Sequence, residues 1–501
     1  MAEPTPEPPR RRGLRWPKVP GGAFGHNVVR LASGTAIGQL LLFLAVPVLT
    51  RLYTPADYGA LAVYSSTLTV LVVLASLRYE AAIPLPEDED IAASLLALTF
   101  VLLFAMAILV SLLVWIAGDA FFVAMKVPAL VPYRWLIPVG FIGAGLYQAV
   151  SYWAIRHREF GRVARTKLTQ GVGQVVAQVG LGVAGVGAPG LLMGDVVGRV
   201  AGGGGLALLA LRGHRDARVT RASVLAAASR YRRFPLLTTW SGLLNVGSLQ
   251  LPSVLFAASF GAAAAGLYAL SFKMLVLPTM LVGQAVGQVF LSRAAPLARE
   301  PERLRQLTER TALTLFACGL PVFGTLALAG PQLFAVLMGD EWDAAGRYAQ
   351  LLAPWFAVWL VSSPLSGLLS VREWQGSALT FSAFEFALRL GALLIGASRG
   401  SPVLTVMLLS ASGIVISLTS IARFMFAGYS SIGRLLDPAA RLLAWATASL
   451  LPAAIALHTG RPRVAIVAGV LAVAGYYIVV LRSAGTWGFR SVDARASGAP
   501  P

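Results

Sequence analysis

One stretch, residues 51–80, most constrains what this chain can fold into. It begins with Arg51, continues through about twenty largely apolar residues and ends at Arg78 and Glu80. A helix needs about 20 consecutive apolar residues to cross the hydrocarbon core of a bilayer, and a soluble domain needs no such run. The sequence therefore predicts a membrane-spanning helix here, with charged residues at both ends.

Apolar runs of this kind recur along the whole chain. Of its 501 residues, 57% are hydrophobic and 13% are charged, whereas soluble domains carry about 25% charged residues. Because every backbone amide inside lipid must be paired within its own segment, each run is predicted to be a helix. We expect an all-α polytopic membrane protein with about fourteen spans. They cover residues 29–50, 57–77, 91–117, 133–155, 167–185, 189–211, 235–258, 263–290, 311–337, 346–371, 377–397, 403–427, 440–458 and 464–481.

The basic residues orient these spans. With the N-terminus in the cytoplasm, 31 of the 41 lysines and arginines fall on the cytoplasmic side and 7 on the outer side. Cytoplasmic loops of membrane proteins collect Lys and Arg, so this bias explains the net charge of +19 without a nucleic-acid partner. Both termini are predicted to be cytoplasmic. The proline- and arginine-rich segment 1–27 is predicted to be a disordered basic tail rather than a cleaved signal peptide.

The chain contains a faint internal repeat. The segment Tyr58-Gly59-Ala60-Leu61-Ala62 resembles Ala265-Gly266-Leu267-Tyr268-Ala269, about 207 residues later, and six spans lie on each side of a basic linker. Internal repeats are typical of transporters in which one half rocks against the other. The predicted organisation is a tail at 1–27, an N-lobe at 28–212, a linker at 213–234, a C-lobe at 235–430, two further helices at 431–482 and a tail at 483–501.

Ionisable residues inside spans are costly and usually face a cavity. Lys273 lies mid-span, too far from either end for its ammonium to reach an interface easily, so we expect it to face a cavity; a pairing carboxylate is the alternative. Glu385 and Arg389 lie four residues apart on one helical face, and so do Asp195 and Arg199. Each pair is either an internal ion pair or part of a cavity wall.

Polar amides recur within the spans, at a spacing of four residues in two places. Such a stripe is either interhelical glue or the wall of a wet cavity, and two stripes together favour a cavity. Neutral hydrogen-bonding groups suit sugars. The amides are Gln39, Gln148, Gln170, Gln174, Gln178, Asn245, Gln250, Gln284 and Gln288.

The sequence carries no motif of an enzyme. It has no Walker-type phosphate loop, its one cysteine is Cys318, and its four histidines are scattered without metal-ligand spacing. We therefore expect no catalytic residue, no metal and no cofactor.

Several segments resemble the polysaccharide-biosynthesis flippases of the oligosaccharide flippase type, within the multidrug/oligosaccharidyl-lipid/polysaccharide exporter superfamily. The segments are VLTRLYTPADYG (48–59), SLRYEAAIPLPEDEDIAASLLALT (76–99), YWAIRHREF (152–160), SLQLPSVLFAASFGAAAAGLYALSFKMLVLP (248–278) and GQAVGQVFLSRAA (283–295). The resemblance covers about residues 27–430. The tail at 1–26 and the alanine- and glycine-rich middle spans depart from the family pattern.

The resemblance implies two six-helix lobes in a V, as in multidrug exporters, with two further helices. It implies a bacterial cytoplasmic-membrane flippase for oligosaccharide on a polyprenyl diphosphate, used in surface polysaccharide biosynthesis, with glycan polymerases or glycosyltransferases as possible partners. The expected cavity and gate residues are Lys273, Arg389, Arg78, Arg51, Arg30, Gln174, Gln284 and Asn245, and the candidate proton carriers are Glu385, Asp195 and Glu80.

Three alternatives stay open at this point. A drug or cation antiporter of the same fold should line its cavity with acidic residues, whereas the mid-span charges here lean basic. A membrane glycosyltransferase or polymerase should carry a long outer loop with carboxylates, and no outer loop here reaches 20 residues. A flippase for the peptidoglycan precursor fits the sequence as well.

Overall fold

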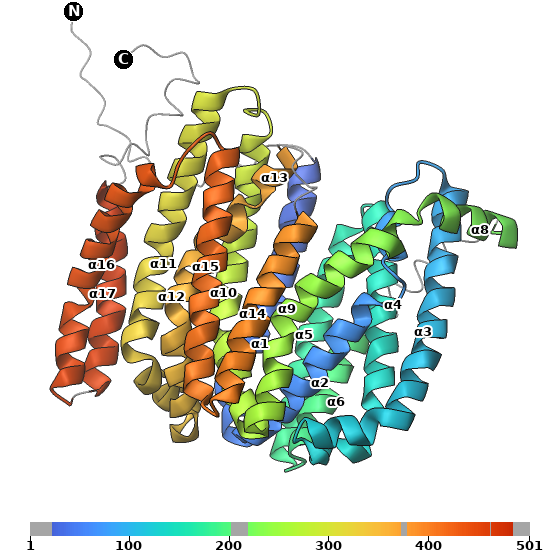
Figure 1. The fold of residues 1–501 in the computed structure, drawn as a ribbon, viewed down its shortest axis with the longest axis horizontal. Helices are drawn as coiled ribbons and strands as arrows, with labels where there is room; N and C mark the ends of the chain where they lie inside the picture. Colours follow the sequence, from blue (N-terminus) through green and yellow to red (C-terminus); the bar gives the residue numbers. More distant parts are fainter. Residues whose placement is uncertain (1–22, 202–218, 372–377, 461, 484–501) are drawn as a thin grey trace, which may run out of the picture.

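The computed structural model describes residues 23–201, 219–371, 378–460 and 462–483. Throughout these residues every regular element is a helix (Figure 1). The first half contains α1 (Ala23–Leu52), α2 (Pro55–Val73), α3 (Glu89–Ala124), α4 (Leu136–Arg156), α5 (Phe160–Val183) and α6 (Ala188–Val200). The second half contains α9 (Thr239–Phe260), α10 (Ala262–Ala294), α11 (Pro301–Met338), α12 (Asp343–Leu365), α14 (Ala378–Ser398) and α15 (Pro402–Ala427). Two C-terminal helices follow, α16 (Gly433–His458) and α17 (Pro462–Ser483).

These fourteen helices correspond one to one with the fourteen predicted spans. Nine candidate spans among the described residues are long and apolar enough to cross a membrane by length and composition alone. Of the helices that fall short, α4 and α5 contain glycines and polar side chains that lower the hydropathy, and the described part of α6 is only 13 residues long. The all-α polytopic prediction is confirmed. Short helices connect the spans: η1 (Tyr79–Ala82), η2 (Pro128–Tyr133), α8 (Arg221–Arg230), η3 (Phe234–Thr238), η4 (Asp340–Trp342) and α13 (Gly367–Val371).

The organising stretch 51–80 is shorter as a helix than its apolar run suggests. Thr54 caps α2, accepting a hydrogen bond from the backbone N–H of Asp57, whose carboxylate accepts one from the Thr54 N–H in return. The helix ends at Val73 rather than near 77, and the turn that follows it contains Leu77 and Arg78 in left-handed backbone conformations with φ of 49° and 65°. Arg78 and η1 therefore lie in the connection to α3 and not within the span.

Helix α11 extends ten residues further than predicted, beginning at Pro301 instead of 311. Its first turns carry Glu302, Arg305 and Glu309, in which Arg305 pairs with both carboxylates at the i,i+3 and i,i+4 spacing. These turns are polar, so a hydropathy criterion excludes them from the span although the backbone is helical.

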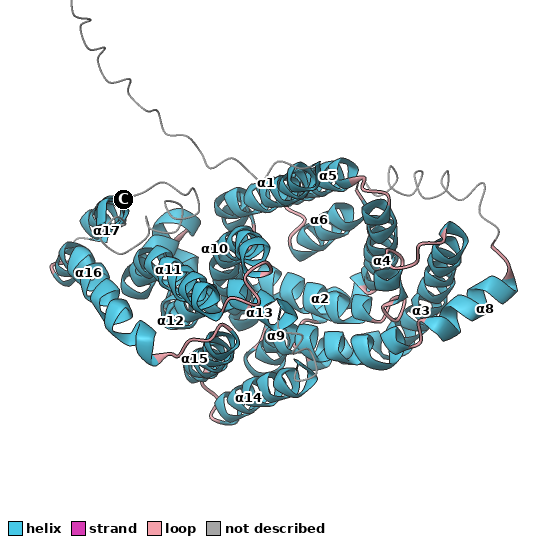
Figure 2. Cartoon of the chain, turned by 90° about the horizontal axis from the view of Figure 1, so that it is seen from above, coloured by secondary structure: helices cyan, strands magenta, loops and turns pink. Residues whose placement is uncertain are grey.

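The helices form two lobes (Figures 1 and 2). The N-lobe is α1–α6 and the C-lobe is α9–α15, with α16 and α17 packed on α11 at the far edge of the C-lobe. Helix α2 packs against α9 and α10, which joins the lobes along the middle of the molecule. The short helix α8 packs on α3 of the N-lobe, where Ser94 and Ser223 share a hydrogen bond of 2.9 Å.

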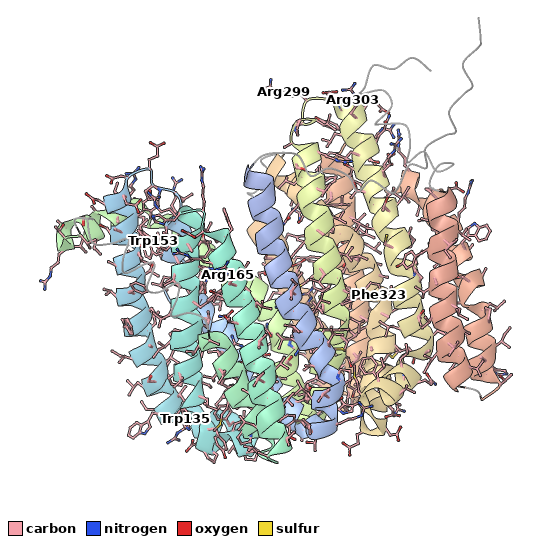
Figure 3. The ribbon with its side chains drawn as sticks, turned by 180° about the vertical axis from the view of Figure 1, so that it is seen from behind. Trp135, Trp153, Arg165, Arg299, Arg303 and Phe323 are labelled. Atoms are coloured by element: carbon pink, nitrogen blue, oxygen red, sulfur yellow. The ribbon has the colours of Figure 1, made fainter. Side chains whose placement is uncertain are left out.

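The two lobes meet tightly at the end opposite Arg299 and Arg303, which Figure 3 labels near the top. A Cβ atom on Gly59 would lie 1.8 Å from the carbonyl oxygen of Ala262, and one on Gly266 would lie 1.9 Å from that of Pro55. Only glycine admits such an approach of two helix backbones. The glycines of the internal repeat thus face each other across the lobe interface.

A second set of contacts closes the same end. The indole N–H of Trp342 donates to the carbonyl oxygen of Thr50 at 3.0 Å, and its ring packs edge-on against Tyr58. The Lys126 ammonium donates to the carbonyl oxygen of Ser259 at 2.9 Å. Each of these contacts joins the N-lobe to the C-lobe, so we refer to them together with the glycine pair as the outer contact.

Candidate functional site

A polar cavity of about 530 Å³ lies inside the N-lobe, among α1, α4, α5 and α6. In Figure 2 these helices and α2 form a ring. We call this space the glutamine cavity, after the four glutamines in its wall. Its lining residues are Gly38, Gln39, Leu42, Ala144, Tyr147, Gln148, Ser151, Tyr152, Ile155, Lys167, Gln170, Gly171, Gln174, Asp195, Gly198 and Arg199. Its wall offers amide, hydroxyl and charged groups to a hydrophilic ligand.

Glycines let the cavity helices approach closely. A Cβ atom on Gly38 of α1 would lie 2.9 Å from the carbonyl oxygen of Lys167, and one on Gly171 of α5 would lie 3.0 Å from that of Gly38. On α6, a Cβ atom on Gly198 would lie 2.8 Å from the Gln174 side chain. The small residues thus bring α1 and α6 against α5, with polar side chains beside the contacts.

Two cations and one carboxylate line the glutamine cavity. Asp195 and Arg199 form an ion pair with an O···N distance of 2.6 Å, at the i,i+4 spacing that the sequence predicts. Lys167 places its ammonium 4.2 Å from the centroid of the Tyr147 ring. Of the described carboxylates, none lies within 4.0 Å of the Lys167 ammonium. With one of the two cations neutralised by Asp195, the wall carries an excess positive charge.

The predicted glutamine stripe on α5 has two different roles. Gln170 and Gln174 line the cavity, and Gln170 also donates to the carbonyl oxygen of Arg199 at 3.3 Å. Gln178 is buried and donates to the carbonyl oxygen of Leu191 at 3.0 Å, which ties α5 to α6. The same stripe therefore contributes both to the cavity wall and to a hydrogen bond that holds two helices together.

Lys273 lies in a second, smaller cavity of about 140 Å³ between α1 and α10. We call it the lysine cavity. Gln284 also lines it, and the rest of its wall is mostly apolar: Leu42, Phe43, Val276, Leu277, Met280 and Leu281. Gln39 and Leu42 line both cavities, so the two spaces adjoin beside α1. Within the described residues Lys273 has no carboxylate inside 4.0 Å, although Asp195 is near enough to attract it electrostatically.

Glu80 lies in η1 and contacts Gln148, one of the residues that line the glutamine cavity. Its carboxylate accepts hydrogen bonds from the Ser76 hydroxyl and from the Gln148 amide, the latter at 2.7 Å, and Arg78 lies 3.9 Å away. Only 2% of Glu80 is exposed, and burial raises the pKa of this carboxyl. Because Gln148 also lines the cavity, Glu80 is one hydrogen bond removed from the cavity wall. The Arg78 guanidinium packs against Gly242 of α9, in the other lobe.

Arg389 and Glu385 lie away from both cavities, in the C-lobe. Arg389 is 7% exposed; it donates to the Ser248 hydroxyl at 2.9 Å and lies over the Trp355 ring at 5.3 Å. The Arg389 and Glu385 side chains do not approach within the 4.0 Å of an ion pair. Arg389 thus joins α14 to α9 within the C-lobe interior, and neither residue lines the glutamine cavity or the lysine cavity.

The remaining predicted site residues lie elsewhere. Arg51 is exposed at the end of α1, where its guanidinium donates to the carbonyl oxygen of Pro47. Asn245 is an exposed residue of α9 that lines neither cavity. The side chain of Arg30 lies outside the described residues.

Lys167 is the cavity residue that sequence reasoning missed. Its position near the start of a span assigned it to the cytoplasmic loop by the positive-inside rule. A signal was present, because Lys167, Gln170 and Gln174 are spaced by three and four residues and so share one helical face. The described residues contain no group of three or more His, Cys, Asp or Glu side chains that could hold a metal ion.

The sequence is similar to proteins of polysaccharide biosynthesis. Residues 48–346 match the family model described as polysaccharide biosynthesis protein. The chain is 23% identical over 172 residues to the lipopolysaccharide biosynthesis protein WzxC of Escherichia coli, covering 34% of this chain and 35% of that protein. It is 25% identical over 319 residues to the succinoglycan biosynthesis transport protein ExoT of Rhizobium meliloti, covering 62% of each. The matches thus span about a third and just under two thirds of these relatives.

Solved structures share the fold. The lipid II flippase MurJ, in an inward closed conformation, superposes with a TM-score of 0.66 at 10% identity, covering 91% of this chain and 99% of that one. An inward-facing multidrug resistance transporter of the MATE family in the MOP superfamily gives a TM-score of 0.57 at 17% identity, covering 83% and 98%. At these identities the likeness establishes the two-lobed fold.

Proposed function

Because this chain belongs to the polysaccharide biosynthesis protein family, we propose that it is a flippase that moves an oligosaccharide on a polyprenyl diphosphate across the bacterial cytoplasmic membrane. Family and fold indicate a transporter rather than a catalyst. One observation carries the proposal for this chain: two adjoining cavities inside a membrane-spanning bundle hold lysines with no carboxylate partner among the described residues. Such cavities suit an anionic, sugar-bearing cargo.

The two cavities divide the work of binding such a cargo. A diphosphate carries about two negative charges, and burying it without a partner would cost several kcal/mol per charge. Lys273 supplies a fixed cation for it, next to an apolar wall that suits the adjoining isoprenoid. The glutamines and tyrosines of the larger cavity offer hydrogen bonds to sugar hydroxyls. The lipid tail stays in the bilayer while the headgroup crosses.

Alternating access would carry the headgroup across. The positive-inside bias assigns the end with Arg299 and Arg303, and both termini, to the cytoplasm. The outer contact then seals the periplasmic end, and the described conformation receives cargo from the cytoplasm. We place the boundary between the rocking units in the linker 213–234, and glycan polymerases or glycosyltransferases would act before and after the flippase.

The residues in the cavity walls also bear on the competing functions. An exporter of cationic drugs needs free carboxylates, and the one carboxylate in the two walls, Asp195, is already paired with Arg199. An anionic cargo is therefore favoured. For proton coupling, Glu80, Asp195 and Glu385 are the candidates; Glu80 is supported best, because Gln148 connects it to the cavity.

The proposal is tested on Lys273 with purified protein in vesicles. Lys273→Gln should reduce the flipping rate of a polyprenyl-diphosphate oligosaccharide about tenfold or more, since a hydrogen bond to a charged group contributes about 1.5–3 kcal/mol. Lys273→Arg should retain most of the rate. Arg293→Gln, an exposed basic position on the same helix, is the matched control.

Normal flipping by Lys273→Gln would overturn the role of Lys273. Failure of the parent protein to move any polyprenyl-diphosphate oligosaccharide, with an active reference flippase in parallel vesicles, would overturn the proposed function. Faster transport of a monosaccharide- or disaccharide-pentapeptide lipid would instead identify a peptidoglycan-precursor flippase.

A further inference from the structure

The two cavities differ in chemistry, and the glutamine cavity contains more charged side chains than a neutral glycan needs for binding. The lysine cavity combines one cation with a mostly apolar wall. The glutamine cavity, which shares Gln39 and Leu42 with it, has amides, tyrosines and three ionisable residues in its wall. Neutral sugars need hydrogen-bonding groups and aromatic faces, but they need no ionised partner. The charges in the glutamine cavity therefore call for a separate explanation.

Arg199 is already accounted for by its neighbour. Asp195 neutralises it at 2.6 Å, and both are on α6. Helix α6 thus contributes a polar but electrically balanced surface to the cavity. The positive charge that remains belongs to Lys167 on α5.

Lys167 lies over an aromatic ring instead of against a carboxylate. Its ammonium is 4.2 Å from the Tyr147 ring centroid, and no described carboxylate lies within 4.0 Å of it. A ring face accepts an ammonium but does not neutralise it. Arg199 is near enough to repel it. A half-buried lysine without a carboxylate partner is suited to bind an anion, because a charge removed from water is stabilised by a paired opposite charge.

We assign the diphosphate to Lys273 rather than to Lys167, because of the walls that surround the two lysines. Lys273 occupies the cavity whose apolar wall matches the junction between diphosphate and isoprenoid. The lining shared through Gln39 and Leu42 allows one ligand to extend from Lys273 into the glutamine cavity. The part of the ligand that reaches Lys167 is then the glycan itself.

We propose that the glycan moved by this protein carries a carboxylate-bearing sugar, and that Lys167 selects for it. This inference rests on the proposed function and specifies its substrate class as an acidic oligosaccharide. In this arrangement the Lys167 ammonium pairs with the sugar carboxylate, Tyr147 holds the lysine side chain in place, and the glutamines bind neighbouring hydroxyls. Lys167 is thus a specificity-determining residue, and Lys273 serves every cargo that has a diphosphate.

The test compares two synthetic probes in vesicles. Both are polyprenyl-diphosphate pentasaccharides, and they differ only in that one hexose of the first is a hexuronic acid in the second. We expect the parent protein to flip the acidic probe about tenfold faster, as one charge-assisted contact allows. Lys167→Gln should abolish this preference by slowing the acidic probe, and Lys167→Arg should preserve it. Lys273→Gln should slow both probes alike.

Arg165→Gln is the matched control, since Arg165 is an exposed basic residue two positions away on the same helix. Equal rates for the two probes with the parent protein would overturn the acidic-glycan inference while leaving the proposed function intact. Equal slowing of both probes by Lys167→Gln would show that Lys167 does not select for the sugar. The parent comparison decides the matter even if a Lys167 variant fails to fold, and transport of neither probe would instead overturn the proposed function.

Discussion

Glu80 shows how one residue can connect a cavity to the joint between two lobes. Its carboxylate accepts hydrogen bonds from Ser76 and from Gln148, which lines the glutamine cavity, while Arg78 lies 3.9 Å away and packs on Gly242 of the C-lobe. Leu77 and Arg78 hold left-handed conformations that cost non-glycine residues about 1–2 kcal/mol each. The surrounding contacts keep this strained turn in place. Because Glu80 is one of these contacts, its ionisation should affect how Arg78 packs against the C-lobe.

The raised pKa of the Glu80 carboxyl should be visible in the pH dependence of the protein's stability. Burial raises the pKa of Glu80, against the attraction of Arg78. Between the ordinary glutamate pKa and the raised pKa, the native protein binds more protons than the unfolded chain, so stability falls as the pH rises. Glu80→Gln mimics the protonated form and still accepts from Gln148. We expect its melting temperature in detergent to fall less over this pH range than that of the parent. Glu341→Gln, at an exposed site, is the control, and an equal effect of both changes would contradict the assignment.

At the scale of helices, the lobe interface depends on two glycines that the internal repeat places in equivalent positions. Gly59 on α2 and Gly266 on α10 allow the two backbones to touch, and Trp342 closes the same end by its bond to the Thr50 carbonyl. The sequence repeat was faint, but it identified the residues that meet at the interface. It did not indicate that they meet each other, because contact across the lobes depends on how the lobes pack.

Gly266→Ala should therefore weaken the outer contact. The added methyl would lie 1.9 Å from the Pro55 carbonyl oxygen, so the helices must separate, at a cost of about 1–3 kcal/mol to the closed arrangement. In a Cys318→Ser background, a cysteine at the buried Thr50 should be protected from an impermeant thiol reagent in the parent and should react in the Gly266→Ala variant.

The control for this change is Gly391→Ala. A Cβ atom on this helical glycine would have no atom within 4 Å other than those of its neighbours in the chain and of the adjacent backbone of its own helix, and alanine favours a helix over glycine by about 1 kcal/mol. This variant should leave the cysteine at position 50 protected. Protection that persists in Gly266→Ala would mean that the glycine pair does not hold the lobes together.

At the scale of the whole molecule, the charge distribution and the cavity position both support the proposed orientation. In the proposed orientation, the end that carries Arg299 and Arg303 (Figure 3) is cytoplasmic, and the outer contact lies at the opposite end. The lysines of the two cavities then lie between a sealed outer end and the cytoplasm. This arrangement is what a cytoplasmic, anionic cargo would require before transport.

Thiol labelling of whole cells tests the orientation. In a Cys318→Ser background, Arg399→Cys lies in the turn between α14 and α15 and Arg303→Cys lies near the start of α11; both sites are exposed. We expect an impermeant maleimide to label position 399 in intact cells and position 303 only after permeabilisation. The reverse pattern would invert the topology and place the cavities toward the outside.

The sequence by itself determined the fold class, the number of spans and the family. The fold class and the spans follow from local patterns, namely apolar runs as long as the bilayer is thick and the distribution of basic residues between them. The family follows from the resemblance of motifs such as VLTRLYTPADYG at 48–59. It also identified the Asp195–Arg199 pair, since residues four apart on a helix are neighbours in any fold. Lys273 stood out because a mid-span charge is costly wherever it lies.

Only the tertiary structure decided which polar residues share a wall. Lys167 lines the glutamine cavity while Arg389 is buried in the C-lobe, and Gln174 and Gln178 on the same stripe serve a cavity and an interhelical bond. The helical period assigns residues to a face, but it does not say what that face meets. That depends on which helices pack together, and here glycines such as Gly38 and Gly171 set how closely they pack. The chemistry of the site therefore arises from contacts between segments that are distant in the sequence.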